Sequence, residues 1–203
     1  MEIAATKPRT TKSRKIPAAL IYERLNGKDL YYKGYREVIK GVKTREEIMG
    51  SSSLQAEIIF QLLRILFSSL DLKRYKVYTN EPGLHIDTGN NLSGDILIYE
   101  NSVLTPDKIN KKYSTVPAFI HLEVDVMADM ETMDDVEYIS NKINRLFAFG
   151  TQKVIWVFTT SQRVLVATPN ADWVWIDWDK DVEIMNGIFF SVGKFLDEQG
   201  IVV

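Results

Sequence analysis

The alternation of hydrophobic and polar residues predicts a strand at 117–126, around which the rest of the chain can be arranged. In its second half, FIHLEVDV, the side chains of Glu123 and Asp125 fall on one side and the intervening apolar residues on the other. A similar apolar run at 94–99 precedes it and contains Asp95 near its start. Neighbouring strands lie roughly 4.8 Å apart, so pairing these two could bring Asp95 and Glu123 together. Converging buried carboxylates are costly unless a cation or a proton compensates them.

Apolar residues at helical spacing predict a long helix over 54–70, with the serines at 51–53 supplying an N-cap. A second helix is expected to end near Phe149, before the stop signal Gly150, and a third at 192–198. Strands are predicted at 75–79, 84–86 and 153–159, and a hairpin joins 164–167 to 173–178.

The N-terminal third is predicted from weaker patterns. Residues 17–24 are expected to form a helical turn, and the glycine-broken alternation at 31–41 predicts a strand pair or hairpin. Residues 88–94 are expected to be a loop. Strands and helices alternate in the middle of the chain, and hairpins flank both ends. This order indicates an α/β class, with a mixed β-sheet flanked by helices and an additional β-hairpin region.

Length and composition fit one domain at 17–203, preceded by a basic tail at 1–16. The tail has a net charge of +4, whereas the whole chain of 203 residues carries −2. It is expected to be disordered, although such an arm could also lie along phosphates. The absence of cysteine excludes disulfides, thiolate zinc sites and cysteine nucleophiles. No apolar stretch approaches the roughly 20 residues of a membrane span, and no secretory signal is apparent, so a cytoplasmic protein is expected.

The order of these features resembles the Uma-two family of restriction-endonuclease-like proteins, within the PD-(D/E)XK nuclease-like superfamily, from about Ile21 to the C-terminus. Residues 36–41 (REVIKG) resemble the family's early YELIDG segment. Residues 93–98 (SGDILI) resemble its PD(V/L) strand, and residues 119–124 (FIHLEV) its LVVEV strand. Lys142, eight residues before the glycine stop, stands where the family has a helix lysine.

The resemblance implies a restriction-endonuclease-like fold and an Mg²⁺- or Mn²⁺-dependent endonuclease that hydrolyses DNA phosphodiester bonds. It assigns Asp95 and Glu123 to the metal, and Lys142 to stabilising the phosphate or positioning water. Hard divalent cations prefer oxygen ligands, which suits two carboxylates. From the residues alone, ordinary salt bridges at strand ends are the commoner role for such acids. Lys142 could equally be a solvated helix lysine.

Two further acids are candidate catalytic residues. Glu57 could add a third oxygen from the long helix, or it could be a surface acid. Asp125 occupies the position at which the superfamily's E-x-K pattern places lysine, and a carboxylate there cannot stabilise a phosphate as an ammonium does. His121, on the same strand face, could be a base or a ligand, although a packed, hydrogen-bonded histidine is commoner.

Departures from the family pattern support an alternative, a catalytically degenerate nuclease-fold protein that acts as a binding or oligomerisation module. Gln55 stands where the family usually has histidine, and Asp125 replaces the lysine of the E-x-K pattern. Residues 123–137 contain seven acids and no base, which would repel DNA. The four tryptophans could form a stacking platform for nucleotides, but their pattern favours core or dimer contacts. We expect DNA as the substrate and no membrane contact, with a homodimer as one of the open oligomeric states.

Overall fold

The computed structural model describes residues 15–129 and 134–203. Only the last two residues of the predicted basic tail fall within these ranges, so the tail prediction lies outside the described residues. Within the described ranges, no helix is both long and apolar enough to cross a membrane.

A six-stranded mixed sheet forms the centre of the molecule, with the strand order β10-β9-β8-β7-β6-β3. The strands are β3 (Tyr75–Thr79), β6 (Ile96–Glu100), β7 (Ile120–Val124), β8 (Lys153–Phe158), β9 (Arg163–Ala167) and β10 (Val174–Asp177). Strands β7 and β8 run parallel and the other neighbours antiparallel. The parallel pair needs a crossover, which α4 (Asp135–Phe149) provides.

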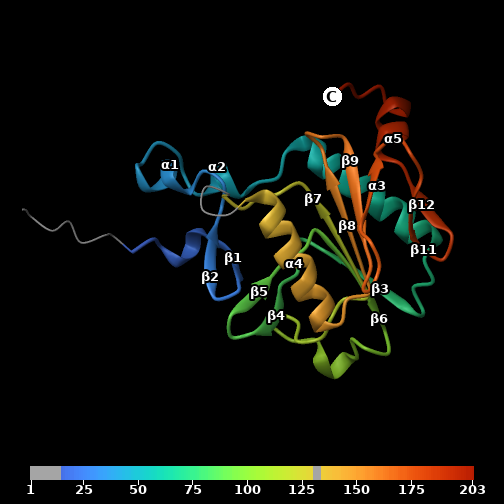
Figure 1. Cartoon of the computed structure of the whole chain (residues 1–203), viewed down its shortest axis with the longest axis horizontal. Helices are drawn as coiled ribbons and strands as arrows, with labels where there is room; N and C mark the ends of the chain where they lie inside the picture. Colours follow the sequence, from blue (N-terminus) through green and yellow to red (C-terminus); the bar gives the residue numbers. More distant parts are fainter. Residues whose placement is uncertain (1–14, 130–133) are drawn as a thin grey trace, which may run out of the picture.

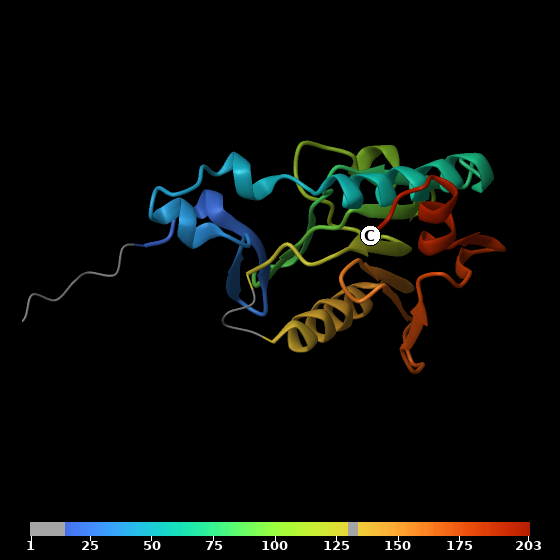
Figure 2. The same cartoon turned by 90° about the horizontal axis from the view of Figure 1, so that it is seen from above.

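Helices cover both faces of this sheet, as Figure 2 shows with α3 above the strands and α4 below them. On one face, α3 (Ser53–Ser69) and α5 (Val192–Glu198) pack on alternate strand residues such as Leu122, together with the hairpin of β11 (Val182–Met185) and β12 (Ile188–Phe190). On the other face, α4 packs on the remaining set, which includes Trp156. Strand alternation therefore separates the core into two layers, one on each side of the sheet.

A second, antiparallel sheet with the order β2-β1-β5-β4 extends the α4 layer (Figure 1). Its strands are β1 (Ile21–Leu25), β2 (Lys28–Tyr31), β4 (Leu84–Asp87) and β5 (Asn90–Leu92). Strands β1 and β2 are joined by a two-residue turn in which Asn26 and Gly27 both have positive φ. Asn-Gly is the preferred sequence for such a turn, so the chain itself encodes this hairpin.

Most predicted elements are confirmed. The long helix, the helix before Gly150 and the last helix form as α3, α4 and α5, and the strands predicted at 75–79, 84–86 and 153–159 and the hairpin at 164–178 are present. The predicted class of a mixed sheet flanked by helices with additional hairpins is confirmed as well.

Three predictions for the first half of the chain are wrong. Residues 17–24 form one 3-10 turn, η1 (Ala18–Leu20), and then strand β1, and the expected loop at 88–94 contains β5. The predicted hairpin at 31–41 is instead helical, as α1 (Tyr35–Ile39), followed by α2 (Glu46–Met49). Left-handed Gly34 ends the extended segment there, and the rings of Tyr31 and Tyr35 stack with centroids 4.8 Å apart. The apparent alternation came from tyrosines that pack on each other.

Candidate active site

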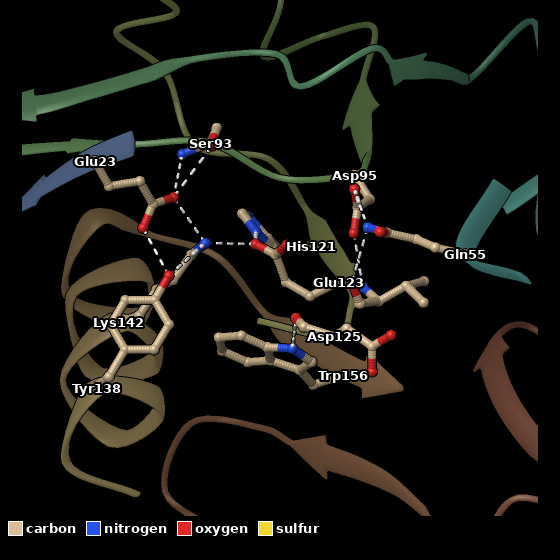
Figure 3. Close-up of polar contacts among 11 residues, drawn as sticks. Glu23, Gln55, Ser93, Asp95, His121, Glu123, Asp125, Tyr138, Lys142 and Trp156 are labelled. Atoms are coloured by element: carbon tan, nitrogen blue, oxygen red, sulfur yellow. Dashed lines mark hydrogen bonds and ion pairs between the residues drawn. The ribbon is translucent and has the colours of Figure 1, made fainter. Parts of the chain in front are cut away.

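Asp95 and Glu123 lie on neighbouring segments at one end of the central sheet, as expected if the two strands pair. Ile96 lies opposite Leu122 in the β6–β7 ladder, so the residues beside them are neighbours. The carboxylate of Asp95 accepts a hydrogen bond of 2.7 Å from the backbone N–H of Val124. Figure 3 shows Asp95 and Glu123 at this strand end, with side chains from both helical layers converging on them.

Gln55, in the first turn of α3, ties that helix to the strand end. Its side-chain amide donates to the carbonyl of Val124 at 3.0 Å and lies 3.5 Å from a carboxylate oxygen of Asp95. The residue is buried, and the Ser52 N-cap accepts from its backbone N–H. Gln55 thus places a polar side chain of α3 beside the Asp95 carboxylate.

The two carboxylates differ in their electrostatics. Burial, and next the charge of Glu123, raise the pKa of Asp95 to about 7. Burial would also raise the pKa of Glu123, but the charge of Lys142 and the neighbouring His121 lower it below its ordinary value. Near neutral pH the pair therefore combines an ionised Glu123 with a readily protonated Asp95, an arrangement common at functional sites.

Lys142, on α4, is fully buried behind Glu123. Its ammonium lies 2.6 Å from Oε1 of Glu123 and 2.8 Å from Oε1 of Glu23. Burial alone would lower the pKa of Lys142, but these two carboxylates raise it well above its ordinary value. A position for Lys142 near Asp95 and Glu123 agrees with this geometry. The predicted contact between Lys142 and a substrate does not, because the residue has no exposed surface.

Glu23, on β1, also belongs to this group of side chains and was not predicted from the sequence. The group, called the cluster below, consists of Glu23, Gln55, Asp95, His121, Glu123 and Lys142. Glu23 is 2% exposed and accepts hydrogen bonds from the backbone and hydroxyl of Ser93 and from the hydroxyl of Tyr138. The prediction of a helical turn at 17–24 concealed it. As a strand, IYERL places Glu23 on the same side as fully buried Leu25, and an acid on an apolar strand face is a signal for a paired site.

His121 is also buried, and its Nε2 lies 2.5 Å from the same Oε1 of Glu123. No partner of its Nδ1 is found among the described residues. The histidine thus packs and holds Glu123, as in the commoner of the two expected roles.

Asp125 and Glu57 are not brought into this cluster by any contact within the described residues. The carboxylate of Asp125 accepts 2.7 Å hydrogen bonds from the backbone and the hydroxyl of Thr159, and its backbone has a left-handed φ of 61°. Glu57 lies two residues after Gln55 on α3, about 200° around the helix axis from the side that reaches Asp95.

Within the described residues, Gln55 lines two cavities. A pocket of about 240 Å³ is lined by Asp95, Gln55 and Glu81, among other residues. Partial loss of solvent, and then the charges of Glu123 and Glu23, raise the pKa of Glu81. A more open groove of about 960 Å³ shares Gln55 and also includes Asp125. Asp95 and Gln55 thus line cavities beside α3, and Glu23 and Ser93 line another of about 290 Å³ beside β1.

The donor set suits a divalent cation in part. Within residues 15–129 and 134–203, no three carboxylate or imidazole groups are close enough together to form a complete ligand set. Mg²⁺, however, is commonly held by one or two carboxylates plus waters and substrate phosphates. Burial and then the charge of Glu123 raise the pKa of Asp95 to about 7, and a cation beside the carboxylate would offset both effects. Asp95 and Glu123 are therefore chemically suited to a partly hydrated hard cation.

The tryptophans are divided between core and surface. Trp156 is 1% and Trp178 9% exposed, whereas Trp175 on edge strand β10 is 47% exposed. Trp156 packs edge-on against Tyr138 and donates through Nε1 to the backbone carbonyl of Asp125 at 2.7 Å. The core role expected for these residues accounts for Trp156 and Trp178.

Comparison with known proteins supports the fold. No family model matches the chain, and no curated protein matches it. A crystal structure from Anabaena variabilis, described as "a putative nuclease belonging to DUF820", has a TM-score of 0.62 and covers 86% of this chain and 89% of its own. The fold is nuclease-like. Sequence identity to that structure is 12%, so the likeness extends to the fold, and the predicted class is confirmed at that level.

Proposed function

We propose that this protein is a metal-dependent nuclease of the PD-(D/E)XK type, related to the Uma-two family, that hydrolyses phosphodiester bonds in DNA. The observation that carries the proposal is the convergence of Asp95, Glu123 and Lys142 at one sheet end within a nuclease-like fold. A neighbour described as "a putative nuclease" is consistent with a nucleic acid substrate.

In this proposal Asp95 and Glu123 hold Mg²⁺ or Mn²⁺. Such a cation would lower the pKa of a coordinated water and neutralise charge on the phosphodiester. Glu123 is kept ionised by Lys142, and both Lys142 and His121 contact its Oε1. Within the described residues, Oε2 is then the oxygen of Glu123 that remains for a ligand.

Asp95 and Gln55 would have distinct tasks. With its pKa raised to about 7, Asp95 is partly protonated at neutral pH and must release that proton when a cation binds. The amide of Gln55 and the N–H of Val124 hold the Asp95 carboxylate at the mouth of the 240 Å³ pocket. Both contacts favour the ionised carboxylate, so they prepare it for the cation.

Lys142 would act through Glu123, because its ammonium is enclosed between two carboxylates. Asp125 would shape the groove wall through its hydrogen bonds from Thr159. A cytoplasmic location and a homodimer remain predictions from the sequence.

A cleavage assay tests the proposal. Supercoiled plasmid and single-stranded DNA are incubated with the wild-type protein and Mg²⁺, Mn²⁺ or EDTA. Asp95→Asn and Glu123→Gln should each lower the cleavage rate at least about 100-fold, since metal-ion stabilisation is worth several kcal/mol. Asp107→Asn, an exposed acid on η2 (Pro106–Lys108), is the matched control and should cleave at the wild-type rate.

Three results would count against the nuclease. Cleavage that persists in EDTA would show that the reaction does not need a divalent metal ion. Equal rates for Asp95→Asn and wild type would remove the assigned site. Absence of cleavage and of metal binding in wild type would favour the binding or oligomerisation module instead.

A further inference from the structure

Glu23 is the most completely hydrogen-bonded acid of the cluster. One carboxylate oxygen accepts from the Ser93 N–H at 2.8 Å, from the Ser93 hydroxyl at 3.2 Å and from the Lys142 ammonium at 2.8 Å. The other accepts from the hydroxyl of Tyr138 at 2.8 Å. These donors come from the segment before β6 and from α4, so Glu23 is fixed from two directions (Figure 3). A carboxylate with this many donors has little capacity left for a cation.

Glu23 is one of the two carboxylates that form ion pairs with the Lys142 ammonium. Its side chain extends from α4 into a space enclosed by the rings of Tyr22, Tyr138 and Trp156, whose centroids lie 5.4–5.9 Å from the ammonium. Aromatic faces attract a cation, but they define its position less sharply than a carboxylate does. With Glu123 alone, the ammonium would have one strong partner and no opposing one.

The hairpin that carries Glu23 is docked on one stripe of α4. Tyr138 and Lys142, four residues apart, reach Glu23, and Arg145 donates to the side chain of Asn26 in the β1–β2 turn at 2.6 Å. Residues at these spacings share a helix face. The N-terminal hairpin and α4 therefore meet along a continuous polar contact, with Glu23 at its buried end.

We propose that Glu23 is a positioning residue that holds the Lys142 ammonium against Glu123 and thereby fixes the carboxylate that faces the candidate metal site. The assignment of that site rests on the proposed function, whereas the dependence of Lys142 on Glu23 does not. Glu23 acts through Lys142 and touches no ligand. The N-terminal hairpin then completes the site, although it lies far from Asp95 and Glu123 in sequence.

NMR spectroscopy of the lysine ammonium groups tests the dependence directly, without metal or DNA. A buried ammonium with two carboxylate partners exchanges its protons slowly, so Lys142 should give a sharp signal that is assigned by its loss in Lys142→Met. In Glu23→Gln this signal should disappear through exchange broadening, because one of the two anions is gone. Asp29→Asn, which removes the partner of Arg24 in the same hairpin, is the matched control and should keep the signal.

The proposal is overturned if Glu23→Gln keeps the Lys142 signal at its wild-type position. Should Glu23→Gln fail to fold by circular dichroism, Ser93→Ala replaces it. Ser93→Ala removes the hydroxyl donor to the oxygen of Glu23 that binds Lys142 and leaves all charges, and it should shift the Lys142 signal, whereas an unchanged signal would again overturn the proposal. Glu23→Asp, which keeps the charge, should restore part of the signal that Glu23→Gln loses.

The affinity for Mg²⁺ provides a second test, which connects Glu23 to the candidate metal site. Outer residues that orient metal ligands typically change metal affinity about 10- to 100-fold when replaced, so Glu23→Gln should weaken Mg²⁺ binding by that factor and Asp29→Asn should not. If wild type binds no Mg²⁺, the proposed function fails while the ammonium signal still decides the role of Glu23. If wild type binds Mg²⁺ and Glu23→Gln binds it equally well, Glu23 does not position the metal carboxylate.

Discussion

Gly94 lies at a point where a side chain would collide with His121. A Cβ at this position would stand 2.6 Å from Nε2 and 2.7 Å from Cε1 of the imidazole. A side chain at position 94 would therefore displace the imidazole ring from its contact with Glu123. The buried histidine thus leaves no space for a side chain at the residue before Asp95.

Gly94→Ala should therefore lower the free energy of unfolding by about 1–3 kcal/mol, the usual cost of overpacking a core. Urea denaturation followed by circular dichroism measures the change. Gly50→Ala is the control, since a Cβ there would meet nothing within 4 Å and the backbone is extended, and it should stay close to wild type. A Gly94→Ala protein as stable as Gly50→Ala would mean that His121 repacks freely.

Asp95 should make stability depend on pH in an unusual direction. Its pKa is raised from 3.8 to about 7, so its protonated form stabilises the fold. That contribution is fully present below the ordinary pKa and is lost as pH rises through about 7. In metal-free buffer, Asp95→Asn should gain stability over wild type between pH 5 and pH 8, by on the order of 2 kcal/mol after allowance for partial exposure.

Urea midpoints at the two pH values measure this effect. Asp87→Asn is the comparison, because hydrogen bonds from Asn90 and Gly89 lower the pKa of that exposed acid. It should show no gain between pH 5 and pH 8. A pH-independent difference between Asp95→Asn and wild type would show that Asp95 is ionised throughout this range.

The placement of individual residues was predictable to different degrees. Strand pairing indicated that Asp95 and Glu123 lie on neighbouring segments, whereas the burial of Lys142 between two carboxylates was not predicted. Glu23 escaped because its partners are 70–119 residues away and its strand was predicted as a turn. The alternation in IYERL at 21–25, which places Glu23 on the side of buried Leu25, was the available signal.

Among the elements, α3 links helix stability to the site. Ser52 accepts a hydrogen bond from the backbone N–H of Gln55, the residue that reaches Asp95. Ser52→Ala should cost about 0.5–2 kcal/mol, as N-cap losses do, and loosen the turn that carries Gln55. Thermal unfolding measures the cost, with Ser53→Ala, one residue inside the helix, as the control. Equal melting temperatures for the two variants would contradict a capping role.

Elements with long, regular patterns were predicted, whereas several short ones before β6 were not. Helices α3 and α4 have apolar residues at sustained helical spacing, and β8 is nearly all apolar. Residues 31–41 have no such run, and a stack of two tyrosines imitated strand alternation. The Asn-Gly turn at 26–27 was a local hairpin signal that outweighs the weak helical appearance of 17–24.

At the scale of the whole molecule, the cluster draws on every layer of the fold. Asp95 and Glu123 come from the central sheet region, Gln55 from one helical layer, Lys142 from the other and Glu23 from the second sheet. The order of elements predicted the layers. The docking of the second sheet on α4 depends on contacts between distant residues, which patterns along the chain do not encode.

Calorimetric titration of Mg²⁺ and Mn²⁺ into wild type, Asp95→Asn and Glu123→Gln at pH 7 and pH 8 tests whether Asp95 and Glu123 bind a divalent cation. Saturable binding to wild type alone, tighter at pH 8 because Asp95 must lose its proton, is the expected result. Equal binding by wild type and both variants, or none by wild type with DNA present, would contradict a metal centre at Asp95 and Glu123.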